Sequence, residues 1–189
     1  YKNKHKKIEG ANTDGIGFCS YLEQDECFNF KGKSILVLGA GGSAKGIISE
    51  MMKRKTLKIK VMNRTEKKSL EIAEHYKNQP TQVIAEKWNT NKPFENIDLI
   101  INTTSFGMEK TEHIKLNTQK LEQPTIVVDI IYNPRQTMFM KDQRNKGFTV
   151  YNGIGMLIRQ AAASFKFWFN IELNRNDIIE IEKIIEQTT

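Results

Sequence analysis

The sequence predicts an α/β protein whose core is a doubly wound, mainly parallel sheet with helices on both faces. Short apolar runs of strand length alternate with stretches whose apolar residues recur at helical spacing, which is typical of βαβ units. The strongest run, Lys33–Gly39, leads directly into a glycine-rich turn and then an amphipathic stretch. Together these observations favour a Rossmann-like fold.

Six stretches are expected as strands. Lys33–Gly39 is almost continuously apolar and contains β-branched residues, which suits a strand buried on both faces. The other five are shorter or more polar: Leu57–Asn63, Val83–Ala85, Asp98–Asn102, Thr125–Asp129 and Thr149–Tyr151. Because helical stretches connect most of them, they should pair in parallel with right-handed crossovers.

Five helices are expected between and after these strands: Gly41–Lys55, Thr65–Tyr76, Gln136–Lys146, Ile154–Phe169 and Asn176–Gln187. Thr65 is expected to cap its helix, whose apolar positions are Leu70, Ile72, Ala73 and Tyr76. The region before residue 33 does not follow the alternation. It holds a strand-like stretch, Lys7–Ala11, and a helical stretch, Thr13–Glu26, that we expect to enter the α/β unit from outside.

Composition limits the classes of protein. The 189 residues are 39% apolar and 27% charged, as in soluble globular domains, and no apolar run approaches the ~20 residues of a membrane span. The formal charge of +7 permits anionic partners, but the lysines are scattered, so a basic solvated surface is favoured over nucleic-acid binding. Cys19 and Cys27 form no metal-binding pattern and fit thiols in a reducing cytoplasm.

The glycine-rich turn matches the G-x-G-x-x-A pattern in its required context of strand, turn and helix. Gly39 permits the tight turn, Gly41 lets the backbone approach a pyrophosphate, and Ala44 lets the helix lie close to the strand. The first helical N–H groups then face the phosphates. The sequence therefore predicts dinucleotide binding by Gly39, Ala40, Gly41, Gly42, Ser43 and Ala44. The alternative is a glycine-rich turn without a ligand.

The end of the next strand indicates which dinucleotide is preferred. An NAD site places Asp or Glu there, to accept a hydrogen bond from the ribose 2′-OH. This chain has Asn63, Arg64 and Thr65, with Lys67 and Lys68 after them. Because a guanidinium can hold a 2′-phosphate through paired charge-assisted hydrogen bonds, we predict NADP as the cofactor. The alternative is that these cations only form part of the solvated surface.

Several segments together resemble the shikimate dehydrogenase family, in the family's order and over about residues 9–169. They are Asn12–Phe18 (NTDGIGF), Gly39–Ala44, Asn63–Thr65, Asn102–Met108 (NTTSFGM), Asp129–Thr137 (DIIYNPRQT) and Gly153–Gln160 (GIGMLIRQ). The resemblance implies NADPH-dependent, reversible reduction of 3-dehydroshikimate to shikimate in aromatic amino-acid biosynthesis. It also implies a small-molecule substrate, with neither nucleic acid nor membrane as partner.

The resemblance also implies roles for individual residues. Asp14 looks like the family's catalytic aspartate, and Asn12, Asp14, Tyr132 and Gln160 look like substrate-binding residues. The cofactor would contact Asn63, Arg64, Thr65, Lys68, Thr103, Thr104, Ser105, Gly153 and Met156, and no metal is implied. Each residue also has a structural alternative: Asp14 as part of a helix start, Tyr132 and Met156 as core residues, and Gln160 as a solvated helix residue.

One expected catalytic group has no counterpart in this chain. Family members carry, before the Asn-Thr-Asp segment, a substrate domain with a catalytic lysine. We therefore expect residues 1–30 to be a remnant of that domain with a connecting helix, 31–170 the NADP-binding domain, and 171–189 a helix packing toward the substrate domain. The chain begins at Tyr1, which suggests a piece of a longer protein. By itself it should bind NADP(H) without turnover, and apolar surface facing the missing domain should promote self-association or a homodimer.

Two other functions remain open at this stage. One is a related dehydrogenase with another substrate, such as a quinate/shikimate or methylenetetrahydrofolate dehydrogenase. The absence of an acidic strand-end residue argues against NAD-using quinate enzymes, and the Asn-Thr-Asp segment with Gln160 argues against the folate enzymes. The other is a non-catalytic NADP-binding module, for which a missing lysine would be natural.

Overall fold

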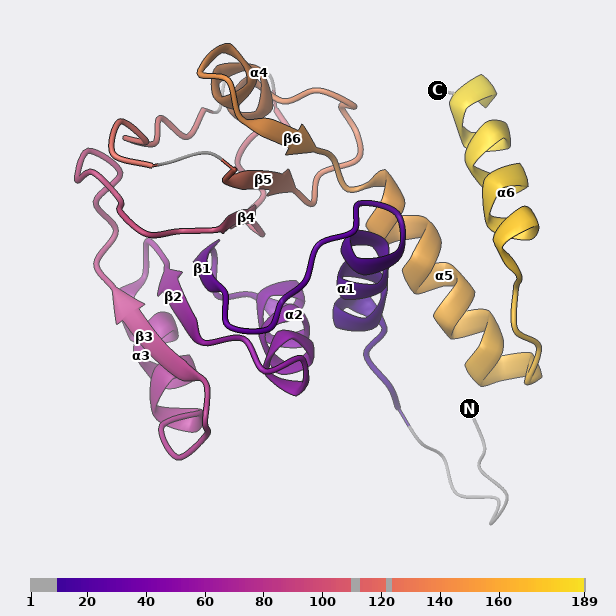
Figure 1. Ribbon diagram of the computed structural model, residues 1–189, viewed down its shortest axis with the longest axis horizontal. Helices are drawn as coiled ribbons and strands as arrows, with labels where there is room; N and C mark the ends of the chain where they lie inside the picture. The colour runs from indigo at the N-terminus through magenta and orange to yellow at the C-terminus, as the bar shows by residue number, and fades with distance from the viewer. Residues whose placement is uncertain (1–9, 110–112, 122–123, 189) are drawn as a thin grey trace.

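A six-stranded parallel sheet forms the centre of the computed structural model, which describes residues 10–109, 113–121 and 124–188 (Figure 1). The strands are β1 (Ser34–Leu38), β2 (Lys58–Met62), β3 (Gln82–Glu86), β4 (Leu99–Asn102), β5 (Ile126–Asp129) and β6 (Thr149–Tyr151). Their order in the sheet is β3-β2-β1-β4-β5-β6, and every neighbouring pair is parallel. The predicted doubly wound fold is confirmed, with its topological switch point between β1 and β4.

The helices are α1 (Asp14–Gln24), α2 (Gly42–Lys53), α3 (Glu66–His75), α4 (Met138–Asn145), α5 (Ile154–Phe169) and α6 (Arg175–Thr188). The predicted helices and strands are confirmed with small differences at their ends, and α5 has the predicted bounds. Thr65 occupies the N-cap position of α3, although its side chain makes no capping hydrogen bond. The expected strand at Lys7–Ala11 falls mainly on residues outside the described ranges.

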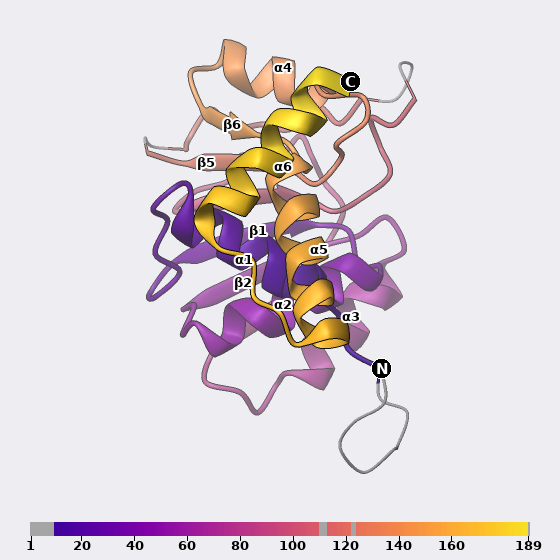
Figure 2. The ribbon, with the colours of Figure 1, turned by 90° about the vertical axis from the view of Figure 1, so that its right-hand side faces the viewer.

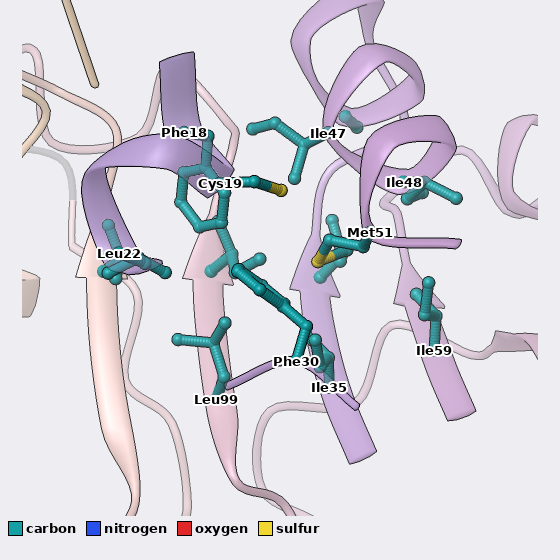
Figure 3. Packing of buried hydrophobic residues seen from close by; sticks show 14 of the residues in the cluster. Phe18, Cys19, Leu22, Phe30, Ile35, Ile47, Ile48, Met51, Ile59 and Leu99 are labelled. Atoms are coloured by element: carbon teal, nitrogen blue, oxygen red, sulfur yellow. The ribbon is translucent and has the colours of Figure 1, made fainter. Parts of the chain in front are cut away.

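Alternate residues of the strands enter two hydrophobic cores. Ile35 and Val37 of β1 join one core with residues of α1, α2 and α3, part of which is seen in Figure 3. Leu36 and Leu38 join the other, which is covered by α4 and by parts of the segments 94–97 and 114–121. All four side chains are fully buried. This two-sided burial explains why the strand reads as a continuous apolar run.

Helix α1 packs into the first core of the α/β unit. Its Phe18, Cys19 and Leu22 are fully buried between α2, α5 and the sheet. Arg159 of α5 donates hydrogen bonds to both carboxylate oxygens of Asp25, immediately after α1. These contacts fix α1 against the helix that follows β6.

Two glycines allow α1 to approach its neighbours closely. A Cβ atom on Gly15 would lie 2.2 Å from the carbonyl oxygen of Gly46 in α2, and one on Gly17 would lie 2.5 Å from the backbone nitrogen of Gln160 in α5. Since real Cβ atoms do not approach backbone atoms so closely, α1 would have to move if either glycine acquired a side chain.

We expect Gly17→Ala to lower the free energy of unfolding by about 1–3 kcal/mol, because the added methyl group overpacks the α1–α5 contact. Urea denaturation followed by circular dichroism measures this change. Gly10→Ala is the matched control, since a Cβ atom there meets no atom within 4 Å. Equal stabilities of the two variants would contradict the close helix contact.

Some exposed positions differ from the sequence pattern. Leu70, expected on the apolar face of α3, is 52% exposed, so that prediction is wrong; Ile72 provides the buried contact instead. Cys19 is buried, whereas Cys27 is exposed and lies after the end of α1. No helix within the described ranges combines the length and apolar character that a membrane crossing needs.

The end of α5 and the segment after it carry an exposed apolar patch. Its members are Phe167, Trp168, Phe169 and Ile171, of which Trp168 is the most exposed at 66%. Helix α6 runs back along α5, as Figure 2 shows, and packs against it through residues that include the buried Ile178.

We expect this patch to cause concentration-dependent self-association, because contiguous exposed apolar surface is favourable to bury. Sedimentation velocity over a range of protein concentrations measures it. Trp168→Glu should reduce the association, whereas Leu57→Glu, at a separate exposed leucine, should not. A chain that remains monomeric at high concentration would contradict the prediction.

Candidate functional site

The turn after β1 has the geometry that its glycines were predicted to provide. Gly39 has a φ of +110°, and a Cβ atom there would lie 2.4 Å from Thr103 Oγ1. Its N–H donates to the carbonyl of Met62 at 2.7 Å, which ties the turn to β2. Only glycine combines this backbone conformation with this close approach.

The space in front of the next glycine is open. A Cβ atom on Gly41 would meet no heavy atom within 4 Å, and Gly41 is the N-cap of α2, whose first turn begins with Gly42 and Ser43. Ala44 is fully buried and packs in the core beneath the helix. The free N–H groups and the positive end of the α2 dipole therefore face an accessible space that suits a phosphate.

A cleft of about 290 Å³ lies at the carboxyl ends of β1, β2 and β4. It brings together ten residues that the sequence pattern and the resemblance had separately assigned to the cofactor, from three segments far apart in the chain. They are Gly39, Ala40, Gly41, Asn63, Arg64, Thr65, Lys68, Thr103, Thr104 and Ser105. Among the lining residues, Arg64 and Lys68 supply positive charge and no carboxylate is present.

Two aromatic residues that sequence reasoning did not identify complete the lining of the cleft. Trp88 and Phe106 have their ring centroids 6.4 Å apart with an interplanar angle of 26°, and the guanidinium carbon of Arg64 lies 5.4 Å from the Phe106 centroid. Such an arrangement is a stacked cation–π contact. Both residues closely follow the carboxyl ends of parallel strands, which is the one sequence signal that could have identified them.

The hydroxyl groups of the turn after β4 are largely used within the protein. Thr103 donates its N–H and its Oγ1 hydrogen to the carbonyl of Leu38, at 2.8 and 2.7 Å. Thr104 donates its N–H and hydroxyl to Oδ1 of Asn102, at 3.1 and 2.7 Å. Ser105 is exposed at the cleft. This turn is therefore a preformed wall whose side chains need little rearrangement.

The start of α5 lies outside the lining of this cleft. A Cβ atom on Gly153 would lie 1.9 Å from the carbonyl oxygen of Ile130, so the close approach of the chain after β5 requires glycine there. Met156 is 5% exposed and packs in the first core. The geometry explains both residues through packing. The backbone N–H of Gly153 donates to the carbonyl of Ile131 at 3.1 Å, and its carbonyl accepts from the N–H of Leu157 at 2.9 Å.

Three of the four residues assigned to substrate, Asn12, Asp14 and Gln160, lie at or beside the first turns of α1. Asp14 is the first residue of α1, half-buried, and its N–H donates to Oδ1 of Asn12 at 2.9 Å. The turn of α1 after Asp14 packs against Gln160 through Gly17. Tyr132 is 51% exposed in the segment after β5. The structure thus brings the helix turns of Asp14 and Gln160 together, while none of the four residues lines the cofactor cleft.

Comparison with known proteins identifies the group to which this geometry corresponds. The family model described as shikimate / quinate 5-dehydrogenase matches residues 22–151, and the model of the shikimate 5′-dehydrogenase C-terminal domain matches residues 153–180. A protein named shikimate dehydrogenase (NADP(+)) from Methanococcus aeolicus is 38% identical over 188 residues, covering 95% of this chain and 66% of its own length. The chain therefore spans about two thirds of the curated relatives that it matches.

Two solved structures share the fold. The 5-ketofructose reductase of a Gluconobacter strain matches with a TM-score of 0.83 and 30% identity, over 96% of this chain and 66% of its own. A chorismate mutase/shikimate 5-dehydrogenase fusion protein from Clostridium acetobutylicum matches with a TM-score of 0.82 and 30% identity, over 98% of this chain and 64% of its own.

Proposed function

Since the chain belongs to the shikimate dehydrogenase family, we propose that it is the NADP(H)-binding part of an enzyme that reversibly reduces 3-dehydroshikimate to shikimate. The observation that carries this proposal is the cleft at the switch point of the sheet, which combines the glycine turn, the start of α2 and two cations. The names of the curated relatives support both the cofactor and the reaction.

The cleft suits a phosphorylated dinucleotide in the following way. The backbone at Gly41, at the start of α2, would hold the pyrophosphate, because no side chain obstructs its approach there. Arg64 and Lys68, with Asn63 and Thr65 beside them in the cleft lining, would hold the adenosine 2′-phosphate. Arg64 and Lys68 are both exposed, so their charges are available to the phosphate. Lys68 adds charge without the planar fork of an arginine.

Reduction of the ketone needs a hydride and a proton. Bound NADPH supplies the hydride. Asp14, the first residue of α1, would bind a substrate hydroxyl, and the proton would come from a separate donor. The 189 residues present no lysine that corresponds to the family's proton donor, so we infer that they bind the cofactor and do not turn over substrate by themselves.

The domain division follows from the same proposal. Residues 31–170 would form the cofactor domain, residues 1–30 a remnant of the substrate domain with the connecting helix, and residues 171–189 a helix that packs toward the substrate domain. The packing of α1 between α2 and α5 suits a connecting helix that is fixed to the cofactor domain. The exposed apolar patch lies near the C-terminal end of the chain and would suit contact with the substrate domain. Its members are Phe167, Trp168, Phe169 and Ile171.

The predicted preference for NADP argues against an NAD-using quinate dehydrogenase. The carboxyl end of β2 carries Asn63 and Arg64 where NAD-using quinate enzymes would have an acidic residue. A non-catalytic NADP-binding module is the second candidate. The two candidate functions predict different results once the substrate domain is supplied: the dehydrogenase part should then show activity, and the non-catalytic module should not.

We expect no oxidation of NADPH by the 189 residues in the presence of 3-dehydroshikimate, although calorimetry should detect NADP⁺ binding. The assay follows the loss of NADPH absorbance, with a full-length member of the family as the positive control. A rate near that of the full-length enzyme would contradict the inferred role of the absent lysine. Absence of NADP⁺ binding would contradict the proposed function itself.

A further inference from the structure

A buried polar network lies at the carboxyl ends of β4 and β5, beneath the cofactor cleft. Asn102 ends β4 and Asp129 ends β5, the two residues face each other in the strand register, and both are fully buried. Asn102 Nδ2 donates to Asp129 Oδ1 at 3.0 Å. Neither residue lines the cleft.

The carboxylate of Asp129 accepts three hydrogen bonds within the protein. Besides Asn102, its Oδ1 accepts from the N–H of Ile131 at 3.2 Å, and its Oδ2 accepts from Thr137 Oγ1 at 2.7 Å. Because a carboxylate only accepts hydrogen bonds, it admits Asn102 in one orientation, with the NH₂ group toward Asp129. The carbonyl oxygen of the Asn102 amide then points to the other side.

That oxygen organises the turn that follows β4. Asn102 Oδ1 accepts from both the N–H and the hydroxyl of Thr104, and Thr104 Oγ1 in turn accepts from the N–H of Phe106 at 3.2 Å. Asn102 Nδ2 also donates to the carbonyl of Phe106 at 3.2 Å. Residues 103–106 form one wall of the cleft, and the stack of Phe106 on Trp88 and Arg64 belongs to it.

We propose that Asp129 is a positioning residue for cofactor binding: its carboxylate fixes the orientation of the Asn102 amide and thereby the shape of the cleft wall formed by residues 103–106. This inference rests on the proposed function of the cleft. Asp129 acts through Asn102 and does not itself touch the cofactor. Loss of its acceptors leaves buried donors unpaired and frees the amide to turn over, which reverses donor and acceptor toward Thr104.

The test uses two tryptophan readouts in a Trp168→Phe background, in which Trp88 is the only tryptophan. Trp88 emission in the absence of cofactor reports its stack with Phe106, and titration with NADP⁺ reports the affinity. We expect Asp129→Ala to shift the emission and to weaken NADP⁺ binding about tenfold. Asp129→Asn should retain both properties to within about twofold, because its carbonyl accepts from Asn102 and Ile131 while its NH₂ donates to Thr137.

Thr125→Val is the matched control. It removes a buried hydrogen bond, from Thr125 Oγ1 to the carbonyl of Ile97, at the opposite end of β5 from the cleft. It should lower the melting temperature and leave both readouts unchanged. If Asp129→Ala does not fold, Asn102→Asp takes its place in the test. This change puts a second carboxylate against that of Asp129, so it should shift Trp88 emission and weaken NADP⁺ binding to a similar extent.

The outcomes separate the inference from the function on which it rests. If the background protein does not bind NADP⁺, the proposed function fails, and the emission of Trp88 still tests the coupling to Asp129. If Asp129→Ala leaves emission and affinity unchanged, as Thr125→Val does, Asp129 is only structural and the inference is overturned. Failure of Asp129→Asn to restore the two properties overturns it as well.

Discussion

Replacing Arg64 with aspartate is expected to lower the affinity for NADP⁺ about a hundredfold and to leave the affinity for NAD⁺ much less affected. Arg64 lines the cleft beside Lys68, exposed and without an acidic partner among the lining residues. The change removes the charge-assisted hydrogen bonds to the 2′-phosphate and sets a carboxylate against it. That carboxylate can instead accept from the ribose 2′-OH of NAD⁺. Calorimetric titration with both cofactors at one fixed salt concentration measures the ratio.

Lys67→Asp is the matched control for this prediction. Lys67 is exposed and adjacent to the cleft residues but does not line the cleft, and its substitution changes the net charge by the same amount. A general electrostatic attraction of the basic protein for the cofactor would respond equally to both variants. A specific 2′-phosphate site responds only to Arg64→Asp. An unchanged ratio of NADP⁺ to NAD⁺ affinity in Arg64→Asp would rule out the assignment of Arg64.

Local patterns in the sequence predicted the fold because strands and helices here are formed by their own residues. The alternating burial of β1 requires apolar residues at every position, and the positive φ of Gly39 requires glycine. What local patterns did not provide is the placement of α1. The insertion of Phe18 into the first core depends on the glycine contact between Gly17 and Gln160, which are far apart in the sequence.

The candidate site, like the fold, was predictable where its residues belong to local sequence patterns. Residues in recognisable turns, such as Gly41 and Arg64, converge on the cleft because parallel strands end at one edge of the sheet. Trp88 was missed because the segment after β3 has no helical or strand period to fix its course. Phe106 was missed because its stacking partner, Trp88, is in that segment. Such contacts between irregular segments depend on tertiary packing, which hydrophobic periodicity does not report.

Asp129→Asn is expected to change how stability depends on pH. Burial of the Asp129 carboxyl group raises its pKa to about 6 from an ordinary value of 3.8, and the hydrogen bonds from Thr137, Ile131 and Asn102 offset only part of this effect. Because the folded state binds the proton more tightly than the unfolded state, protonation stabilises the fold. That contribution is complete below pH 3.8 and is lost as the pH rises through 6.

The wild-type protein should therefore lose about 2–3 kcal/mol relative to Asp129→Asn between pH 4 and pH 7. Other titrating groups affect both proteins equally, so the difference between their free energies of unfolding isolates Asp129. Urea denaturation at several pH values measures it, and a difference that does not vary with pH would contradict the prediction. A neutral asparagine would thus make the fold more stable at pH 7 while retaining the hydrogen bonds to Asn102. A carboxylate at this position is therefore costly for folding at pH 7, whereas the acceptor oxygen that orients Asn102 is provided by asparagine as well.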